Sequence, residues 1–429
     1  LNVADSASLE VVVSEQAVAG APDRLVVQPK PLAIGIGAER GAEPGDAAGL
    51  VREVLDEAGF APQSVAVLAS LDLKEDESAL LFISETYSWP ARFFDAGRLE
   101  AETPRLINPS DMVYQAVGCH GVAEAAALAA VGAEGELVVA KRIGRRVTCA
   151  LARAPVPIEA ENAGRGRASL AIVGLGPGGR QWRSNEADEL IGQASDIVGY
   201  GLYLDLAGPL RRGQRAHDFA LGEEAARVAH ALDLAAEGRR VALISSGDAG
   251  IYGMAALAFE MIETGPAHWR RVEVTVAPGI SALQAAAARA GAPLGHDFCA
   301  ISLSDLMTPA AVIERRIVAA AQGDFVIALY NPASKRRRQL LSRAIEILRQ
   351  HRSAATPLVI ARALGRPGET VDIMRLDQFD ADAVDMLSLV LVGSSTTRSF
   401  ERGNGATSVY TPRGYTLGQS DTGLSKVAP

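Results

Sequence analysis

The chain has 429 residues, of which 48% are hydrophobic and 22% charged, and its formal net charge is -9. This length exceeds what one hydrophobic core usually supports, so we expect roughly two to four domains. The acidic balance argues against nonspecific nucleic-acid binding, which needs a dominant basic surface. No apolar run is long enough to span a membrane and the chain start lacks a signal-peptide pattern, so we expect a cytoplasmic protein without membrane contact.

The cysteines argue against two further classes of protein. The chain has only three, Cys119, Cys149 and Cys299, and they are far apart. An odd number at such spacing fits neither a disulfide framework nor a zinc site. We therefore expect small, mostly buried apolar residues at these positions and no bound metal ion.

Strand and helix patterns alternate through the first part of the chain. A buried strand at 32–37 enters a glycine turn, and a helix at 46–58 stops at Gly59. Further strands are expected at 64–70 and 136–140, and further helices at 75–85 and 122–131. The alternation predicts a small α/β domain over residues 31–152. Residues 1–30 contain two short strands, which we interpret as the remnant of a preceding region.

A segment rich in Pro, Gly and charge, residues 153–168, follows without apolar periodicity and is interpreted as a linker. The alternation of strands and helices then resumes to residue 412. Its main strands are expected at 240–245, 272–277, 325–330, 358–361 and 387–392. A Gly- and Pro-marked break at 291–295 divides it into two α/β subdomains, 169–290 and 291–412. The polar tail, 413–429, is expected to be disordered.

The most informative segment is 171–179, A-I-V-G-L-G-P-G-G, a strand that runs into a glycine turn. Its spacing satisfies the dinucleotide-binding pattern G-x-G-x-x-G, with Gly174, Gly176 and Gly179 in place. Pro177, however, removes an amide that a phosphate would need, and no acidic residue closes a second strand about twenty residues later. We therefore reject a dinucleotide site, and expect a different ligand against this backbone.

Three more turns follow predicted strands in the same part of the chain. They are S-S-G-D-A-G-I-Y at 245–252, V-A-P-G-I-S-A at 276–282 and I-A-L-Y-N-P at 327–332. Asp248 either holds a ligand hydroxyl or amino group or caps the helix that follows, and Ser281 has the same two interpretations. Because open α/β sheets bind ligands at the carboxyl ends of their strands, the turns together indicate one crevice.

In their order along the chain and in their amino-acid sequences, these four turns resemble those of the tetrapyrrole methyltransferase family. The resemblance covers nearly all of residues 169–411 and implies a two-domain α/β (class III) methyltransferase with its active site in the interdomain cleft, using S-adenosylmethionine. Segments 301–309, 330–336 and 198–203 are similar to the precorrin-3B C(17)-methyltransferase branch of cobalamin biosynthesis. One departure is Ala249, where many relatives carry proline after the aspartate.

The resemblance implies a set of site residues. The cofactor-binding candidates are Pro177, Ser246, Gly247, Asp248, Ile251, Ser281, Ala282, Asn331 and Ala361. The substrate-binding candidates are Gly176, Gly178, Thr308, Lys335, Arg337 and Arg338.

Methyl transfer is a one-step displacement that needs alignment more than a nucleophile, and no nucleophile–base pair is evident. The catalytic candidates are therefore limited to His217, Ser304 and Asp305, with His217 the side chain suited to proton transfer. Because a tetrapyrrole carries many carboxylates, the basic runs at 335–338 and at 211–215 are either substrate contacts or solvated surface.

The first domain resembles the C-terminal domain shared by the cobalamin proteins CobE and CbiG. The match rests on segments 35–41, 68–77 and 121–128, with Lys141 and Thr148. Read from the residues alone, 74–77 (K-E-D-E) is a solvated helix start whose acids suit the positive end of the helix dipole.

The resemblance thus implies methylation of precorrin-3B at C-17 with ring contraction to precorrin-4. Three alternatives stay open. Two are enzymes: a cobalt-factor III C(17)-methyltransferase of the anaerobic pathway, and a methyltransferase that acts at a different position. The third is a tetrapyrrole-binding protein that passes on an intermediate, with the first domain as an auxiliary part. We further expect a homodimer, a small-molecule precorrin substrate and transient contact with other cobalamin-pathway enzymes.

Overall fold

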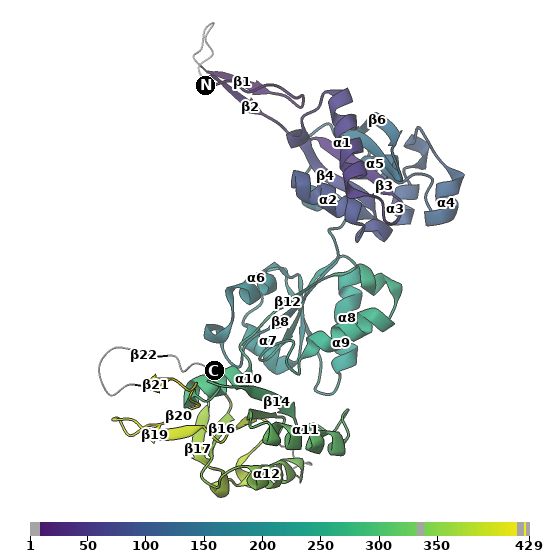
Figure 1. Cartoon of the computed structure of the whole chain (residues 1–429). Helices are drawn as coiled ribbons and strands as arrows, with labels where there is room; N and C mark the ends of the chain where they lie inside the picture. Colours follow the sequence, from purple (N-terminus) through teal and green to yellow (C-terminus); the bar gives the residue numbers. More distant parts are fainter. Residues whose placement is uncertain (1–8, 333–338, 418–423, 426–429) are drawn as a thin grey trace. The chain divides into compact units, whose positions relative to one another are not determined.

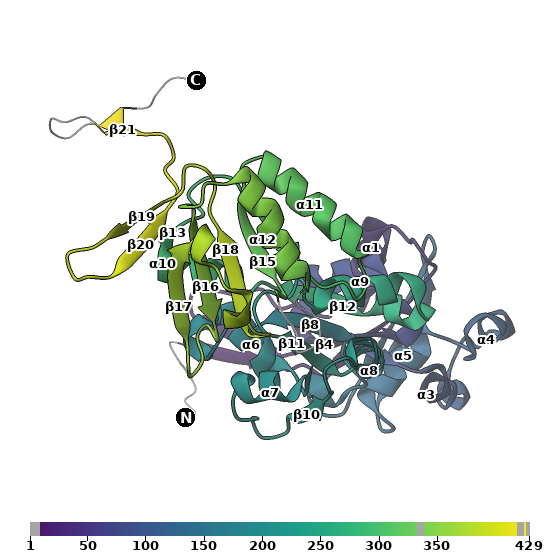
Figure 2. The ribbon, with the colours of Figure 1, turned by 90° about the horizontal axis from the view of Figure 1, so that it is seen from below.

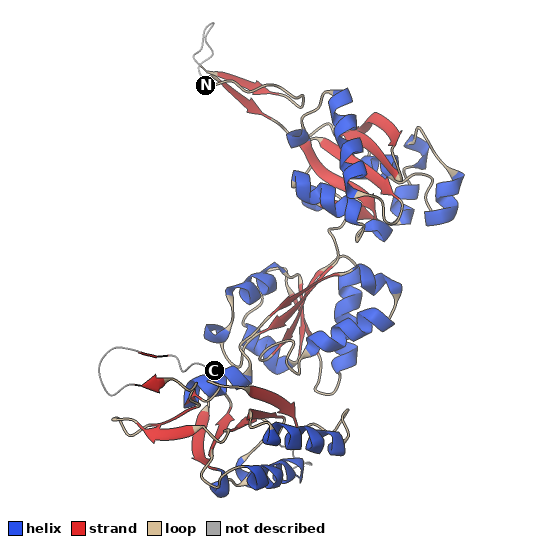
Figure 3. Cartoon of the chain, in the orientation of Figure 1, coloured by secondary structure: helices blue, strands red, loops and turns tan. Residues whose placement is uncertain are grey.

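The computed structural model describes residues 9–332, 339–417 and 424–425. The chain divides into two compact units (Figure 1). One consists of Leu1–Leu170, Leu232–Arg240 and Ile262–Val274, and the other of Ala171–Ala231, Val241–Met261 and Thr275–Pro429. Helices flank the three five-stranded sheets, which confirms an α/β fold (Figure 3). Among the described residues, no helix is both long and apolar enough to cross a membrane.

The first sheet has the strand order β5-β4-β3-β7-β6. Strand β3 pairs in parallel with β4 and β4 with β5, whereas β7 pairs antiparallel with both β3 and β6. The strands are β3 (Leu32–Ala38), β4 (Val65–Leu71), β5 (Ala91–Phe94), β6 (Glu136–Ile143) and β7 (Val147–Arg153). A separate parallel pair precedes this sheet, β1 (Glu10–Val13) and β2 (Arg24–Val27).

Helices cover both faces of this sheet because alternate residues of β3 point to opposite sides. Ile34 and Ile36 are buried with α1 (Pro44–Ala58) and α2 (Ser78–Tyr87), whereas Ala33 is buried with α5 (Ala123–Val131). At Gly35 an added Cβ would lie 1.9 Å from the Ala123 carbonyl oxygen, so the glycine permits the close approach of α5. The shorter α3 (Ala96–Glu100) and α4 (Asp111–Val117) lie between β5 and α5 in the chain.

The expectation of a solvated helix start at 74–77 is wrong for Glu75 and Glu77. Helix α2 begins only at Ser78, and the acids follow a 3-10 turn, η2 (Asp72–Lys74). The Glu75 and Glu77 side chains are 1% and 2% exposed.

Partners distant in the sequence explain this burial. Glu75 Oε2 accepts a hydrogen bond from Arg165 Nη1 at 2.9 Å. Glu77 Oε1 accepts the Gly41 amide at 2.9 Å, and Arg40 Nη1 lies 3.6 Å from Glu77 Oε2. Local sequence patterns do not reveal such partners, so the acids looked solvated.

The segment predicted to be a linker is held to the first unit by main-chain hydrogen bonds. Phe93 and Arg165 exchange two backbone hydrogen bonds of 2.8 and 3.0 Å, and the Ile158 amide donates to the Lys30 carbonyl at 2.9 Å. Arg92 Nε donates to the carbonyl oxygen of Ala163 at 2.7 Å. The segment is therefore ordered by polar contacts, which an apolar pattern cannot report.

The second sheet has the order β10-β9-β11-β8-β12, with β9 parallel to β10 and β11. Val173, Ile197 and Ile244 lie in its core. The strands are β8 (Ser169–Gly174), β9 (Asp196–Gly199), β10 (Arg215–Asp218), β11 (Arg240–Ser245) and β12 (Glu273–Ala277). The helices are α6 (Asn185–Gln193), α7 (Gly201–Ala207), α8 (Glu224–Ala236) and α9 (Met254–Thr264).

The third sheet is mixed and has the order β14-β15-β18-β16-β17. Only β14 and β15 pair in parallel. Helices α11 (Ala310–Gln322) and α12 (Gln339–His351) lie side by side on one face, and α10 (Ala282–Ala290) packs on the other (Figure 2). The strands are β14 (Phe298–Ser302), β15 (Val326–Tyr330), β16 (Pro357–Arg362), β17 (Thr370–Arg375) and β18 (Ser388–Val392).

The break expected at 291–295 is partly a strand. Strand β13 (Gly291–Ala292) pairs with β20 (Thr407–Tyr410), which also pairs with β19 (Arg398–Glu401). In the predicted tail, β21 (Thr416–Leu417) pairs with β22 (Leu424–Ser425), while residues 418–423 and 426–429 lie outside the described chain.

Candidate functional site

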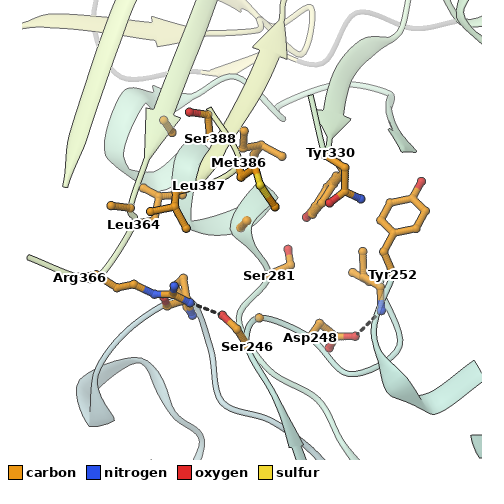
Figure 4. Close-up of a pocket in the computed structure, with 18 of the residues that line it drawn as sticks. Ser246, Asp248, Tyr252, Ser281, Tyr330, Leu364, Arg366, Met386, Leu387 and Ser388 are labelled. Carbon is orange, nitrogen blue, oxygen red and sulfur yellow. Dashed lines mark hydrogen bonds between the residues drawn. The ribbon is translucent and has the colours of Figure 1, made fainter. Parts of the chain in front are cut away.

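A pocket in the second unit gathers turns that are far apart in the sequence (Figure 4). Every residue predicted to bind the cofactor lines it. These residues are Pro177, Ser246, Gly247, Asp248, Ile251, Ser281, Ala282, Asn331 and Ala361. The remaining lining residues are Tyr203, Tyr252, Tyr330, Ala363, Leu364, Arg366, Met386, Leu387, Ser388 and Leu389.

The turns after β8, β11 and β12 pack backbone against backbone beside this pocket. Gly176 and Gly247 exchange two main-chain hydrogen bonds, of 3.1 and 2.8 Å. A Cβ on Gly279 would lie 2.1 Å from the Gly247 carbonyl oxygen, and one on Gly174 would lie 2.7 Å from the same atom. Glycine is therefore required at these positions by the close approach of the turns to one another.

The glycines predicted to bind substrate serve the same packing and are not among the lining residues. Gly176 pairs with Gly247, and a Cβ on Gly178 would lie 2.0 Å from the Gly365 carbonyl oxygen. The turn also leads into a 3-10 helix, η5 (Arg180–Trp182), before α6 begins. No α-helix N-terminus follows the glycines directly, which agrees with the rejection of a dinucleotide site.

Asp248 ties two of these turns together. Its Oδ1 accepts hydrogen bonds from the amides of Gly250 at 2.8 Å and Ile251 at 3.1 Å, and its Oδ2 accepts the Gly279 amide at 3.0 Å. It lies six residues before α9 starts at Met254, so it caps a turn and not the helix. A carboxylate accepts about four hydrogen bonds, so Asp248 retains capacity for a ligand.

Three lining residues other than glycine adopt left-handed backbone conformations. Their φ angles are 53° at Tyr252, 51° at Asn331 and 48° at Ala363. Such conformations cost about 1 kcal/mol or more for tyrosine and alanine, and strained backbone of this kind is concentrated at functional sites. These backbone conformations therefore indicate a functional site independently of the sequence motifs.

The pocket tyrosines are uncharged hydrogen-bonding groups. Burial raises the pKa of Tyr203, Tyr252 and Tyr330 above the usual range, so each stays protonated at neutral pH. The Tyr252 hydroxyl donates to the Ala300 carbonyl at 3.0 Å, and the Tyr330 oxygen accepts the Leu283 amide at 3.0 Å. Their rings lie 5.2 Å apart and form an aromatic wall.

Sequence analysis missed Arg366. Its Nε donates to the Pro177 carbonyl at 2.8 Å and its Nη2 to the Ser246 hydroxyl at 2.6 Å. The signal was present, because the turn A-L-G-R-P-G at 363–368 follows β16 just as the other turns follow their strands. Met386 and Leu387 precede β18, and their sequence carries no comparable signal.

The catalytic candidates do not line the pocket. His217 lies on β10, where its Nε2 is 2.8 Å from Asp196 Oδ1 and its Nδ1 is 3.0 Å from His230 Nε2. Ser304 and Thr308 are half-buried and Asp305 is exposed. Lys335, Arg337 and Arg338 lie outside the described residues, so their role stays a prediction.

Comparison with known proteins identifies the family of the chain. Residues 169–380 match the family model of Tetrapyrrole (Corrin/Porphyrin) Methylases. A precorrin-3B C(17)-methyltransferase from Sinorhizobium sp is 46% identical over 247 residues, which cover 58% of this chain and 97% of that protein. The chain belongs to the tetrapyrrole methylase family.

Three further matches cover the methylase and the first domain. A probable cobalt-factor III C(17)-methyltransferase from Salmonella typhimurium is 44% identical over 248 residues, 58% of this chain and 100% of that protein. The crystal structure of the methyltransferase CobJ matches with a TM-score of 0.54 and 42% identity, covering 57% of this chain and all of that one. Residues 32–152 match the model of Cobalamin synthesis G C-terminus. Both resemblances inferred from the sequence are confirmed.

Proposed function

We propose that this methylase transfers a methyl group from S-adenosylmethionine to C-17 of precorrin-3B in cobalamin biosynthesis, with ring contraction to precorrin-4. The observation that carries the proposal is the match to a C(17)-methyltransferase over 97% of that protein's length. The pocket supports it, because all the predicted cofactor-binding residues lie together there.

The residues present fit such a donor. Leu364, Leu387 and Ile251 offer apolar contacts for an adenosine, while the turn at Ser246–Asp248 offers polar groups for a ribose or an amino acid. S-adenosylmethionine supplies an electrophilic methyl group on its sulfonium. The protein's contribution is alignment of donor and acceptor, which explains why the pocket needs no nucleophilic side chain.

A cobalt-containing substrate is the second candidate. The Salmonella typhimurium relative, named for cobalt-factor III, is 44% identical, close to the 46% of the precorrin-3B relative. One relative is named for a substrate without cobalt and the other for a substrate with cobalt, so their similarity to this chain does not decide between the two substrates. The comparisons do not favour the non-catalytic binding protein, since both relatives are named as methyltransferases.

The decisive experiment supplies the purified chain with S-adenosylmethionine and either metal-free precorrin-3B or cobalt-factor III. We expect a mass gain of one methyl group on the metal-free substrate and formation of S-adenosylhomocysteine. Turnover of the cobalt-loaded substrate alone would assign the second candidate. Donor binding without turnover on either substrate would contradict both.

The domain boundaries and assembly belong to the same proposal. We assign residues 31–152 to an auxiliary domain and 169–412 to the methylase; the matched family ranges are 32–152 and 169–380. A cytoplasmic homodimer that contacts other cobalamin-pathway enzymes transiently is the working assembly. Light scattering of the purified chain measures the oligomeric state.

A further inference from the structure

We propose that Arg366 binds a carboxylate of a ligand held in this pocket. The carboxylate belongs either to the methionine part of the donor or to an acetate or propionate of the tetrapyrrole. The inference rests on the proposed function, because both ligands that function names are carboxylates. It adds a specific anchoring residue that was not among the residues predicted from the sequence.

Arg366 has N–H groups that are not used in its contacts with the protein. A guanidinium carries five N–H groups, and this one donates once to the Pro177 carbonyl and once to the Ser246 hydroxyl. Within residues 9–332 and 339–417, its Nη1 donates to no acceptor. The side chain is half-buried and lines the pocket, and Nη1 is the group it has left for a ligand.

The nearby acids, Glu369 and Asp248, form hydrogen bonds with other groups and do not neutralise the positive charge of Arg366. Glu369 accepts the Gly365 amide at 2.6 Å through Oε2 and Arg289 Nε at 2.6 Å through Oε1. Asp248 accepts three backbone amides. In the part of the chain that the structure describes, Arg366 forms no ion pair with a carboxylate. A half-buried cation in this position favours an anionic ligand.

The guanidinium is also preorganised. Its loop is closed by a hydrogen bond from the Arg366 amide to the Ala363 carbonyl at 3.0 Å and by the Glu369 contact to Gly365. Figure 4 shows the Arg366 side chain directed at Ser246, on the same side of the pocket as Leu364. A fixed planar fork loses little entropy on binding a carboxylate, and its geometry matches two carboxylate oxygens.

A purely structural clamp is the competing explanation, because the same two hydrogen bonds join the glycine turn to the turn after β11. A test must therefore separate loss of a ligand contact from loosening of the turns. We choose Arg366→Gln, which removes the charge, and Arg366→Lys, which keeps the charge without the fork. Arg375→Gln is the matched control, since Arg375 pairs with Asp377 and does not line the pocket.

The probes are S-adenosylhomocysteine, 5′-methylthioadenosine, which lacks the amino-acid part, and precorrin-3B in turnover. We expect Arg366→Gln to weaken one carboxylate ligand about 10- to 100-fold, Arg366→Lys to recover part of that loss, and Arg375→Gln to change nothing. Selective weakening of S-adenosylhomocysteine, with 5′-methylthioadenosine unchanged, assigns the donor carboxylate. A raised KM for precorrin-3B with unchanged S-adenosylhomocysteine affinity assigns the tetrapyrrole.

Two results would overturn the inference while leaving the proposed function intact. One is equal weakening of S-adenosylhomocysteine and 5′-methylthioadenosine, which a structural clamp predicts. The other is unchanged binding and KM in both Arg366 variants. If the unsubstituted chain itself bound no S-adenosylhomocysteine, the proposed function would fail first and this inference would fall with it.

Discussion

The Gly279 amide donates to Oδ2 of Asp248 at 3.0 Å and thereby joins the turn after β12 to the turn after β11. The same carboxylate closes its own turn through Gly250 and Ile251. One side chain thus fixes the relative position of two pocket edges, so we expect its removal to weaken ligand binding through the backbone as well as through any direct contact.

We expect Asp248→Ala to weaken S-adenosylhomocysteine binding by about 1.5–3 kcal/mol, the usual cost of losing hydrogen bonds to a charged group. Asp248→Asn keeps one oxygen for Gly250 and Ile251 but turns an amide toward Gly279, so we expect an intermediate loss. Calorimetric titration measures both, with the exposed Asp297→Asn as control. Wild-type affinity in a folded Asp248→Ala variant would contradict the assignment.

Substitution of Gly178 tests the backbone packing of the pocket. An added Cβ would lie 2.0 Å from the Gly365 carbonyl oxygen, so Gly178→Ala must displace the loop that carries Arg366. We expect a lower thermal midpoint and weaker donor binding. Gly403→Ala is the control, because a Cβ there meets nothing within 4 Å. Equal behaviour of the two variants in both measurements would show that the loop tolerates the displacement.

Several elements of this fold were predicted from sequence patterns. The strand at 240–245 coincides with β11, and the predicted helix at 46–58 differs from α1 only at its start. Ser281 caps α10 through a capping box with Gln284, as its position before the helix suggested. Such features depend on near neighbours in the chain, which is why periodicity and turn residues report them.

Long-range polar contacts could not be predicted in this way. The residues around Glu75 give no sign of its partner Arg165, which lies 90 residues later in the chain. The burial of Glu75 was therefore not predicted. Arg366 was missed although its loop follows β16 in the same way that the recognised turns follow their strands. The resemblance instead supplied the cofactor-binding candidates, all of which the structure brings into one pocket.

The ion pair of Glu75 predicts a large effect on stability. Glu75→Gln leaves Arg165 beside a neutral group in a site where the acid is only 1% exposed. Arg165 is 25% exposed and also lies 3.7 Å from Asp72, so we expect a loss of about 1.5–3 kcal/mol, the usual cost of a hydrogen bond to a charged group. Glu39→Gln is the matched control, since Glu39 is 69% exposed and its pair with Arg146 is worth about 1 kcal/mol or less. Chemical denaturation that gave the two variants the same stability would contradict the buried pairing.

Glu369 predicts how the loop of Arg366 responds to acid. Burial would raise the pKa of Glu369, but hydrogen bonds from Arg289 and the Gly365 amide outweigh burial and hold it below the usual value. The stabilisation is therefore present above the unfolded pKa of about 4.3 and is lost as the pH falls through the lower folded value.

The matched variant Glu369→Gln lacks this dependence. We expect the difference in thermal midpoint between the unsubstituted chain and Glu369→Gln to be largest near neutral pH and to shrink below about pH 4. Thermal melts across that range measure it. A difference that stayed constant with pH would show that the ionised carboxylate contributes nothing.

The last prediction concerns the basic run at Lys335, Arg337 and Arg338, which lies outside the described residues. If these side chains bind tetrapyrrole carboxylates, Arg337→Gln with Arg338→Gln should raise the KM for precorrin-3B and flatten its dependence on salt, because exposed ion pairs are screened as ionic strength rises. S-adenosylhomocysteine affinity should not change. The matched variant, Arg211→Gln with Arg212→Gln, removes two exposed charges from the other basic run. If only this second variant raised the KM, the substrate contact would be assigned to residues 211–215. If neither variant raised it, both basic runs would be solvated surface. Arg366 would then be the next cation to test as a contact of the tetrapyrrole.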